Sequence, residues 1–95
     1  MPKKKAPRTP AAAPVADLAA AIRRRRRALR LTQIELGRLA GCGPDFLYDL
    51  EAGKPTIRMD KLLGVLAVLG LELRLAEGKR TLTVDDALDG DGSAT

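Results

Sequence analysis

Histidine and tryptophan are absent from this chain of 95 residues, and cysteine, phenylalanine and tyrosine each occur once. A single cysteine forms no internal disulfide, and without histidine a zinc site lacks its usual nitrogen donors. The catalytic pairs of histidine with serine or cysteine are excluded for the same reason. We therefore expect a protein that is not an enzyme and that uses no metal or other cofactor.

Long apolar runs are also absent, since no segment approaches the roughly 18–20 apolar residues that a membrane-spanning helix needs. The alanine-rich start, interrupted by prolines, lacks the apolar core of a secretory signal. We expect a cytoplasmic protein that does not associate with membranes. A domain of this size is near the lower limit for folding alone, so a partner chain is the expected source of extra stability.

The basic residues gather at the N-terminal end. Residues 1–30 carry ten basic and one acidic side chain, residues 31–70 carry four and five, and residues 71–95 carry three and six. The formal net charge of +5 shows only that the chain tolerates anionic partners. The position of the charge is more informative than its sum.

Both ends of the chain have the composition of disordered segments. Residues 1–14 hold four prolines and a lysine triplet, which predicts a disordered basic arm, either solvated or lying along phosphates or in a minor groove. Residues 85–95 are acidic and contain glycine, and they predict a disordered tail. The structured part is expected to lie between them.

Two helices are predicted before the middle of the chain. Leu18, Ile22 and Leu29 are spaced for one face of a helix over residues 15–30. Thr32 and Glu35 match a capping box, which starts a second helix at residue 33. Gly41 is expected to end that helix in the left-handed conformation.

A third helix is predicted to begin at Pro44, because proline suits the first helical position, and to end near residues 51–53. A fourth covers residues 59–69 and is apolar on nearly every side, which predicts burial against its own domain and against another subunit. Residues 71–76 alternate leucine with charge, and residues 80–84 could form a second strand. An isolated hairpin is marginal, so pairing with a twin chain is expected.

The stretch LTQIELGRLAGCGPDFLYDLEAGK resembles the helix-turn-helix of the lambda-repressor and Cro-like (XRE) family. The matching residues are Leu31, Thr32, Gln33, Leu36, Leu39, Ala40, Gly41, Leu47, Leu50, Glu51, Gly53 and Lys54. The resemblance implies a mainly all-α fold, a compact DNA-binding domain of four to five helices over residues 15–70. Residues 71–84 would follow as a strand or hairpin for dimerisation.

The continuation GKPTIRMDKLLGVLAVLGLELRL is similar to HipB-type antitoxins. That likeness implies a nucleoid-associated homodimer that represses transcription from a palindromic double-stranded operator and neutralises a HipA-like kinase toxin. Two alternatives remain: a stand-alone XRE regulator without a toxin, or a protein-interaction module that uses the same fold. The family's usual serine or threonine at position 43 is glycine here. Pro44 and Asp45 replace the polar or basic residues often found at the start of the family's third helix, so base preference does not transfer from a relative.

In this family the third helix enters the major groove. The expected base-reading residues are Pro44, Asp45, Phe46, Tyr48 and Asp49. The two carboxylates could accept from cytosine N4, although Asp45 could equally cap the helix. The two aromatic rings are expected to contact a thymine methyl and a phosphate or base, with packing against the second helix as the alternative.

Phosphate contacts are expected from the start of the second helix, from the loop after the third, and from the first helix. The candidate residues are Thr32, Gln33, Arg38, Lys54, Arg58, Arg23 and Arg27. Solvent exposure without DNA contact is the alternative for the arginines.

The resemblance pairs Arg26 with Glu51 as a structural ion pair. The dimer interface is expected to use apolar side chains of the fourth helix and the strand, namely Leu66, Leu69, Leu71, Leu73 and Leu75. Cys42 is expected to pack as a small apolar residue, with redox sensing as the alternative.

Overall fold

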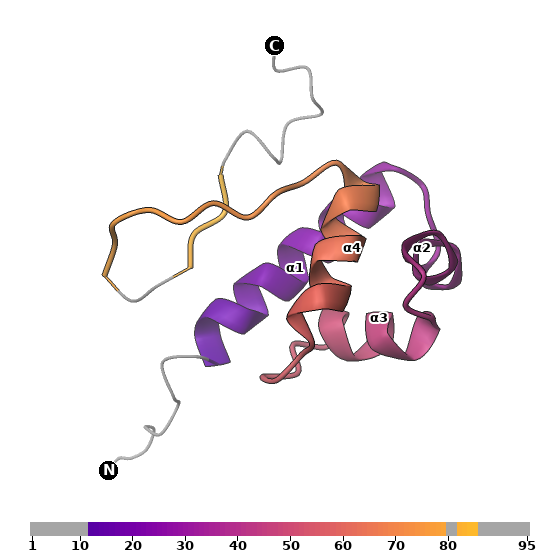
Figure 1. The fold of residues 1–95 in the computed structure, drawn as a ribbon, viewed down its shortest axis with the longest axis horizontal. Helices are drawn as coiled ribbons and strands as arrows, with labels where there is room; N and C mark the ends of the chain where they lie inside the picture. The colour runs from indigo at the N-terminus through magenta and orange to yellow at the C-terminus, as the bar shows by residue number, and fades with distance from the viewer. Residues whose placement is uncertain (1–11, 80–81, 86–95) are drawn as a thin grey trace.

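The computed structural model describes residues 12–79 and 82–85 of the chain. Four helices follow one another in this part: α1 (Ala12–Ala28), α2 (Gln33–Ala40), α3 (Pro44–Glu51) and α4 (Met59–Leu69). Figure 1 shows α4 in front of α1, with α2 viewed along its axis and α3 below them. The expected mainly helical fold is confirmed.

The first helix differs from its predicted bounds at both ends. It begins at Ala12, so residues 12–14 are helical rather than part of a disordered arm, and proline is tolerated there because it lies in the first turn. It ends at Ala28 because Arg30 takes a positive φ of 61°. Leu29, which the spacing assigned to the core, is therefore 42% exposed. Residues 1–11 lie outside the described residues.

The geometry of the turn between α2 and α3 requires glycine at two positions. Gly43 has φ 82° and ψ 161°, a backbone region that other residues avoid, which accounts for glycine where the family has serine or threonine. Gly37 lies in the middle of α2 against this turn. A Cβ on Gly37 would lie 2.6 Å from the carbonyl oxygen of Gly43, so the side chain must be absent for the two helices to meet.

The core is built from all four helices. Its buried side chains are Ile22, Leu36, Leu47, Leu50, Leu62, Val65, Leu66 and Leu69. The sequence placed Leu66 and Leu69 at a dimer interface, but they are 3% and 1% exposed within the single chain. This expectation needs correction, because α1 and α2 already cover the apolar face of α4 that carries them.

The segment after α4 contains no strand within residues 71–79 and 82–85, so the described part of a single chain does not form the expected strand or hairpin, and its pairing with a second chain stays a prediction. Figure 1 shows this segment leaving the helices in an extended path and returning. A strand is defined by hydrogen bonds to a neighbouring strand, and the described part of this chain supplies none. Residues 80–81 and 86–95, including most of the expected tail, lie outside the described residues.

Candidate nucleic-acid interface

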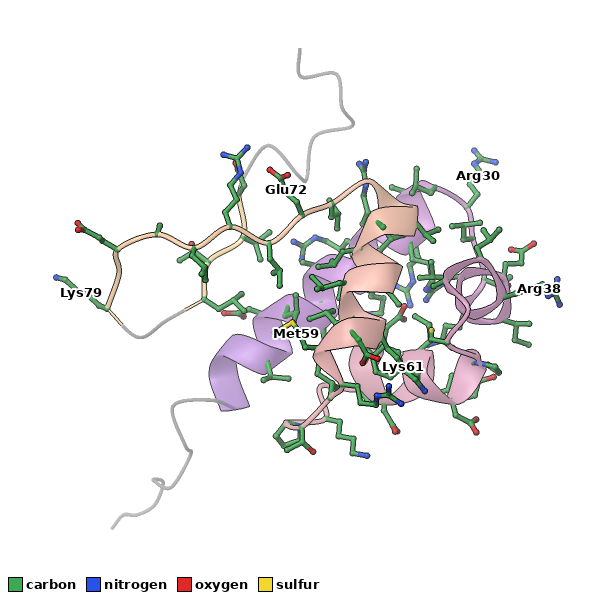
Figure 2. The ribbon with its side chains drawn as sticks, viewed as in Figure 1. Arg30, Arg38, Met59, Lys61, Glu72 and Lys79 are labelled. Atoms are coloured by element: carbon green, nitrogen blue, oxygen red, sulfur yellow. The ribbon has the colours of Figure 1, made fainter. Side chains whose placement is uncertain are left out.

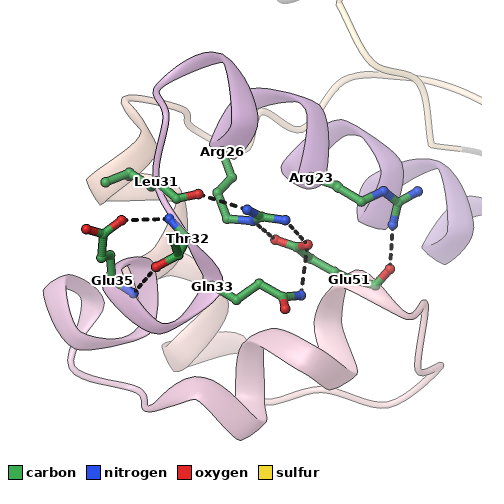
Figure 3. A network of polar contacts seen from close by, with 7 residues as sticks. All are labelled: Arg23, Arg26, Leu31, Thr32, Gln33, Glu35 and Glu51. Atoms are coloured by element: carbon green, nitrogen blue, oxygen red, sulfur yellow. Dashed lines mark hydrogen bonds and ion pairs between the residues drawn. The ribbon is translucent and has the colours of Figure 1, made fainter.

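The start of α2 is closed by its own side chains. The Thr32 hydroxyl accepts from the Glu35 backbone N–H at 3.0 Å, and the Glu35 carboxylate accepts from the Thr32 backbone N–H at 2.8 Å (Figure 3). These hydrogen bonds hold the pKa of Glu35 below its ordinary value, because they favour the carboxylate form. The predicted capping box is confirmed, and it sets the N-terminal end of α2 at Gln33.

A buried ion pair joins α1 to α3. Arg26 Nε and Nη2 lie 2.6 and 2.9 Å from the two carboxylate oxygens of Glu51, and both side chains are nearly covered, at 11% and 3% exposed. Arg26 Nη1 also donates to the Leu31 carbonyl at 2.8 Å. The hydrogen bond with Glu51 raises the pKa of Arg26, so its charge is permanent.

Gln33 belongs to the same network. Its Nε2 donates to Glu51 Oε1 at 3.1 Å (Figure 3). A carboxylate only accepts hydrogen bonds, so the amide nitrogen must face Glu51 and the Gln33 carbonyl oxygen must point elsewhere. Sequence reasoning placed Gln33 on phosphate and missed this link, because no local pattern pairs Gln33 with a residue 18 positions away.

The arginine run of α1 is largely committed to main-chain carbonyls. Arg23 Nη1 donates to the Glu51 carbonyl at 2.8 Å, and Arg25 Nε donates to the Leu69 carbonyl at 2.9 Å. These carbonyls lie at the C-terminal ends of α3 and α4, where helices leave acceptors without intrahelical donors. Arg23 was expected on phosphate or in solvent, and Arg27 is the exposed member of that pair.

The outward face of α3 carries most of the expected base-reading residues. Pro44, Asp45, Tyr48 and Asp49 are exposed, and Tyr48 retains 44% of its surface. Phe46 is half-buried and packs against the core, so only part of its ring is available. The structure therefore brings four of the five together on a free surface and sets Phe46 at its edge.

Two of the expected phosphate-binding residues are paired with carboxylates. Lys54 Nζ lies 3.5 Å from Asp49 Oδ2, with both side chains about half exposed. Arg58 makes two contacts with Asp60, at 2.6 and 3.1 Å, and lowers the pKa of that carboxyl. Arg38 is exposed on the side of α2 away from the core. Lys54 and Arg58 thus reach the solvent from the loop after α3, and their charges are partly neutralised.

Lys61 was missed altogether. Its Nζ lies 5.9 Å from the centroid of the Phe46 ring, within the range of a cation–π contact. The sequence carries no local signal for this contact, because Lys61 and Phe46 lie on different helices and meet only in the folded chain.

Cys42 lies in the turn and is half-buried. Its Sγ contacts the Gly43 carbonyl at 3.6 Å, and burial raises the pKa of the thiol, which keeps it protonated. A protonated thiol is a weak nucleophile and suits a packing role. Within the described residues, no three acidic or sulfur-bearing side chains gather as metal ligands.

The leucines expected at a dimer interface divide into two groups. Leu66 and Leu69 belong to the core, and Leu71 is half-buried against it. Leu73 is 44% exposed and Leu75 is fully exposed. On α4, the apolar side chains of Met59 and Leu63 are also exposed, at 58% and 48%. Neither residue is among the leucines expected at the interface.

A family model described as a helix-turn-helix domain matches residues 17–87, well over half of the chain. The chain belongs to the helix-turn-helix family. It is also 47% identical over 66 residues to an uncharacterized HTH-type transcriptional regulator, y4mF, from Sinorhizobium fredii, an alignment that spans 68% of this chain and 87% of that protein. The XRE-like resemblance is confirmed at the level of the family.

In this helix-turn-helix protein the matched region contains α2, the turn and α3, together with the network that joins them to α1. None of the helices described for residues 12–79 and 82–85 is long and apolar enough to cross a membrane.

Proposed function

We propose that this helix-turn-helix protein is a sequence-specific transcriptional repressor that binds a palindromic operator as a homodimer. Family membership and the name of the relative support DNA-binding transcriptional regulation. The observation that carries the proposal is the exposed face of α3 beside the capped start of α2. In this arrangement α3 enters the major groove, and half-sites would lie roughly 34 Å apart.

The residues of α3 would divide the work of reading. Asp45 and Asp49 accept hydrogen bonds from cytosine N4, and Tyr48 donates to a phosphate or a base. Carboxylates repel phosphates, so these acids contribute to discrimination more than to affinity. The exposed part of Phe46 contacts a thymine methyl, while the rest of the ring packs against the core.

Affinity would come from the surrounding backbone contacts. Thr32 would meet a phosphate at the start of α2 through its hydroxyl hydrogen. Gln33 would do so through its backbone N–H and the amide hydrogen that it does not give to Glu51. The remaining contacts come from Arg27, Arg38, Lys54 and Arg58. Arg23 leaves the phosphate set in this proposal, because its guanidinium already holds the Glu51 carbonyl.

A homodimer would cover the apolar side chains that one chain leaves exposed. Leu73 and Leu75 lie in an extended segment that has no partner strand among residues 12–79 and 82–85. Met59 and Leu63 are exposed on α4. A second copy could pair with residues 71–76 and bury these side chains, which supports dimerisation through this end of the molecule.

The narrower part of the proposal makes the chain the antitoxin of a HipA-like kinase. It rests on the likeness of residues 53–75 to HipB-type antitoxins. Co-purification with the product of an adjacent kinase gene, and loss of that kinase's activity in the complex, is the expected result. If the neighbouring gene does not encode a kinase, the antitoxin proposal fails and the stand-alone regulator is favoured.

The central experiment selects a preferred duplex from random DNA and compares its binding with that of a scrambled duplex of equal length. We expect a preference of at least about a thousandfold at physiological salt, since specific binding by such domains exceeds non-specific binding by that order. Asp49→Asn should change the selected base at one position, whereas the control Asp17→Asn, an exposed carboxylate on α1, should not. Equal binding to both duplexes would favour a protein-interaction module instead.

A further inference from the structure

The helix proposed to read DNA has no positive charge of its own. The sequence of α3 is PDFLYDLE, which holds three acidic residues and no basic one. Glu51 is neutralised by Arg26, but Asp45 and Asp49 remain on the exposed face. A helix with two exposed carboxylates entering a groove between phosphates needs cations close by.

The two cations of the following loop are already engaged. Lys54 faces Asp49 at 3.5 Å, and Arg58 faces Asp60 at 2.6 Å. A phosphate that took either cation would have to release a carboxylate beside it. The net charge that these pairs bring to a DNA backbone is therefore close to zero.

Lys61 is in a different situation. It lies in the first turn of α4, and its Nζ sits over the ring of Phe46, in the first turn of α3. Among residues 12–79 and 82–85, no carboxylate comes within ion-pairing distance of this ammonium. Figure 2 shows Lys61 on the side of the molecule where α4 meets α3, whereas Lys79 lies at the far end of the segment after α4.

We propose that Lys61 is a DNA-phosphate contact that holds the N-terminal end of α3 at the groove, an inference that rests on the proposed DNA-binding function. The Phe46 ring keeps the ammonium beside the start of α3 without neutralising it, because the attraction is to a ring quadrupole and not to a counter-charge. A phosphate can then take the ammonium with no carboxylate to displace. The Lys61–Phe46 contact would replace the basic residues that α3 lacks.

The test measures the salt dependence of binding by the full chain to the selected duplex. Lys61→Met keeps an apolar stem over Phe46 and removes the charge, Lys61→Arg keeps the charge, and Lys79→Met removes one charge away from α3. We expect Lys61→Met to lower the slope of log K against log salt by about 0.9, the value for one phosphate contact, and to weaken binding several-fold at low salt. The slope should stay near the wild-type value in the other two variants.

Equal slopes for Lys61→Met and Lys79→Met would overturn the inference. So would a loss of affinity in Lys61→Met with an unchanged slope, because Lys61 would then act through the packing of Phe46. Circular dichroism of each variant verifies the fold. The proposed function fails separately, if the wild-type protein shows no preference for the selected duplex, and the slope on non-specific DNA would still test the lysine.

Discussion

Helices α3 and α4 differ in the contacts that hold the chain at their C-terminal ends. Arg23 and Arg26 of α1 and Gln33 of α2 all donate to Glu51, and together they form what we term the Glu51 network. After α4, Arg25 holds the Leu69 carbonyl, and the chain then runs on with Leu73 and Leu75 exposed. The side chains that hold the end of α3 all come from the same chain, whereas the leucines that follow α4 stay exposed in a single chain.

This difference separates the stability of the domain from its assembly. The Glu51 network fixes α3 against α1 and α2 without a second subunit, so the face proposed to read DNA is formed in the monomer. Residues 72–79, which are all exposed, contribute little to that fold. Their exposed leucines instead favour a role in pairing with another copy.

The largest effect is expected from breaking the Glu51 network. Arg26→Met leaves the Glu51 carboxylate buried without its cation, which should lower the free energy of unfolding by about 3–5 kcal/mol. Denaturant unfolding followed by circular dichroism measures it. Arg27→Met, the exposed neighbour, should change stability by less than about 0.5 kcal/mol. Similar losses in both variants would mean that the pair is not a structural element.

The next effect compares two leucines on either side of the end of α4. Leu69→Ala removes a core side chain and should cost about 2–5 kcal/mol, whereas Leu75→Ala removes a fully exposed one and should cost less than about 0.5 kcal/mol in dilute protein. At high concentration, Leu75→Ala should instead weaken the dimer in sedimentation experiments. A dimer indifferent to Leu75 would move the interface elsewhere.

A smaller effect is expected from closing the gap between α2 and the turn. Gly37→Ala places a Cβ against the backbone of Gly43 and should destabilise the domain by about 1–3 kcal/mol. Gly64→Ala is the control, since its Cβ would lie 3.4 Å from the Ala40 carbonyl oxygen and alanine suits a helix interior better than glycine. Thermal unfolding of the two variants should therefore shift in opposite directions.

The smallest effect concerns pH. The pKa of Glu35 is lowered in the folded chain by its hydrogen bonds with Thr32, so the stability that this carboxylate contributes is present above its ordinary value of 4.5. It is lost as the pH falls through the lower, folded value. The difference in unfolding free energy between wild type and Glu35→Gln should shrink over that range. If the difference in unfolding free energy stayed constant down to pH 2, the Glu35 carboxylate would not contribute to stability through the capping box as expected.

Much of the helix-turn-helix was predictable because its signals are local. Thr32 and Glu35 are three residues apart, and their hydrogen bonds form within one turn, so the start of α2 could be placed to the residue. Pro44 likewise marks the start of α3, and Gly70 marks the end of α4, through backbone conformation alone. The outward position of Asp45 and Asp49 follows from the helical period.

The partners of the arginines were not predictable in this way. The run from Arg23 to Arg27 looks uniform in sequence, yet Arg23 donates to a carbonyl 28 residues away and Arg25 to one 44 residues away. Which arginine meets which helix end depends on how α1 crosses α3 and α4. The contact of Lys61 with Phe46 depends on the same packing.

By itself, then, the sequence determined that four helices form, where the capped α2 begins, and the family, because these depend on interactions within a few residues. Only the tertiary structure decided that Leu66 and Leu69 serve the chain's own core, that the arginine run holds helix ends, and that residues 71–79 lack a partner strand. The reason is physical: an apolar helix face or a cationic side chain specifies that it needs a partner, and the packed chain specifies which one.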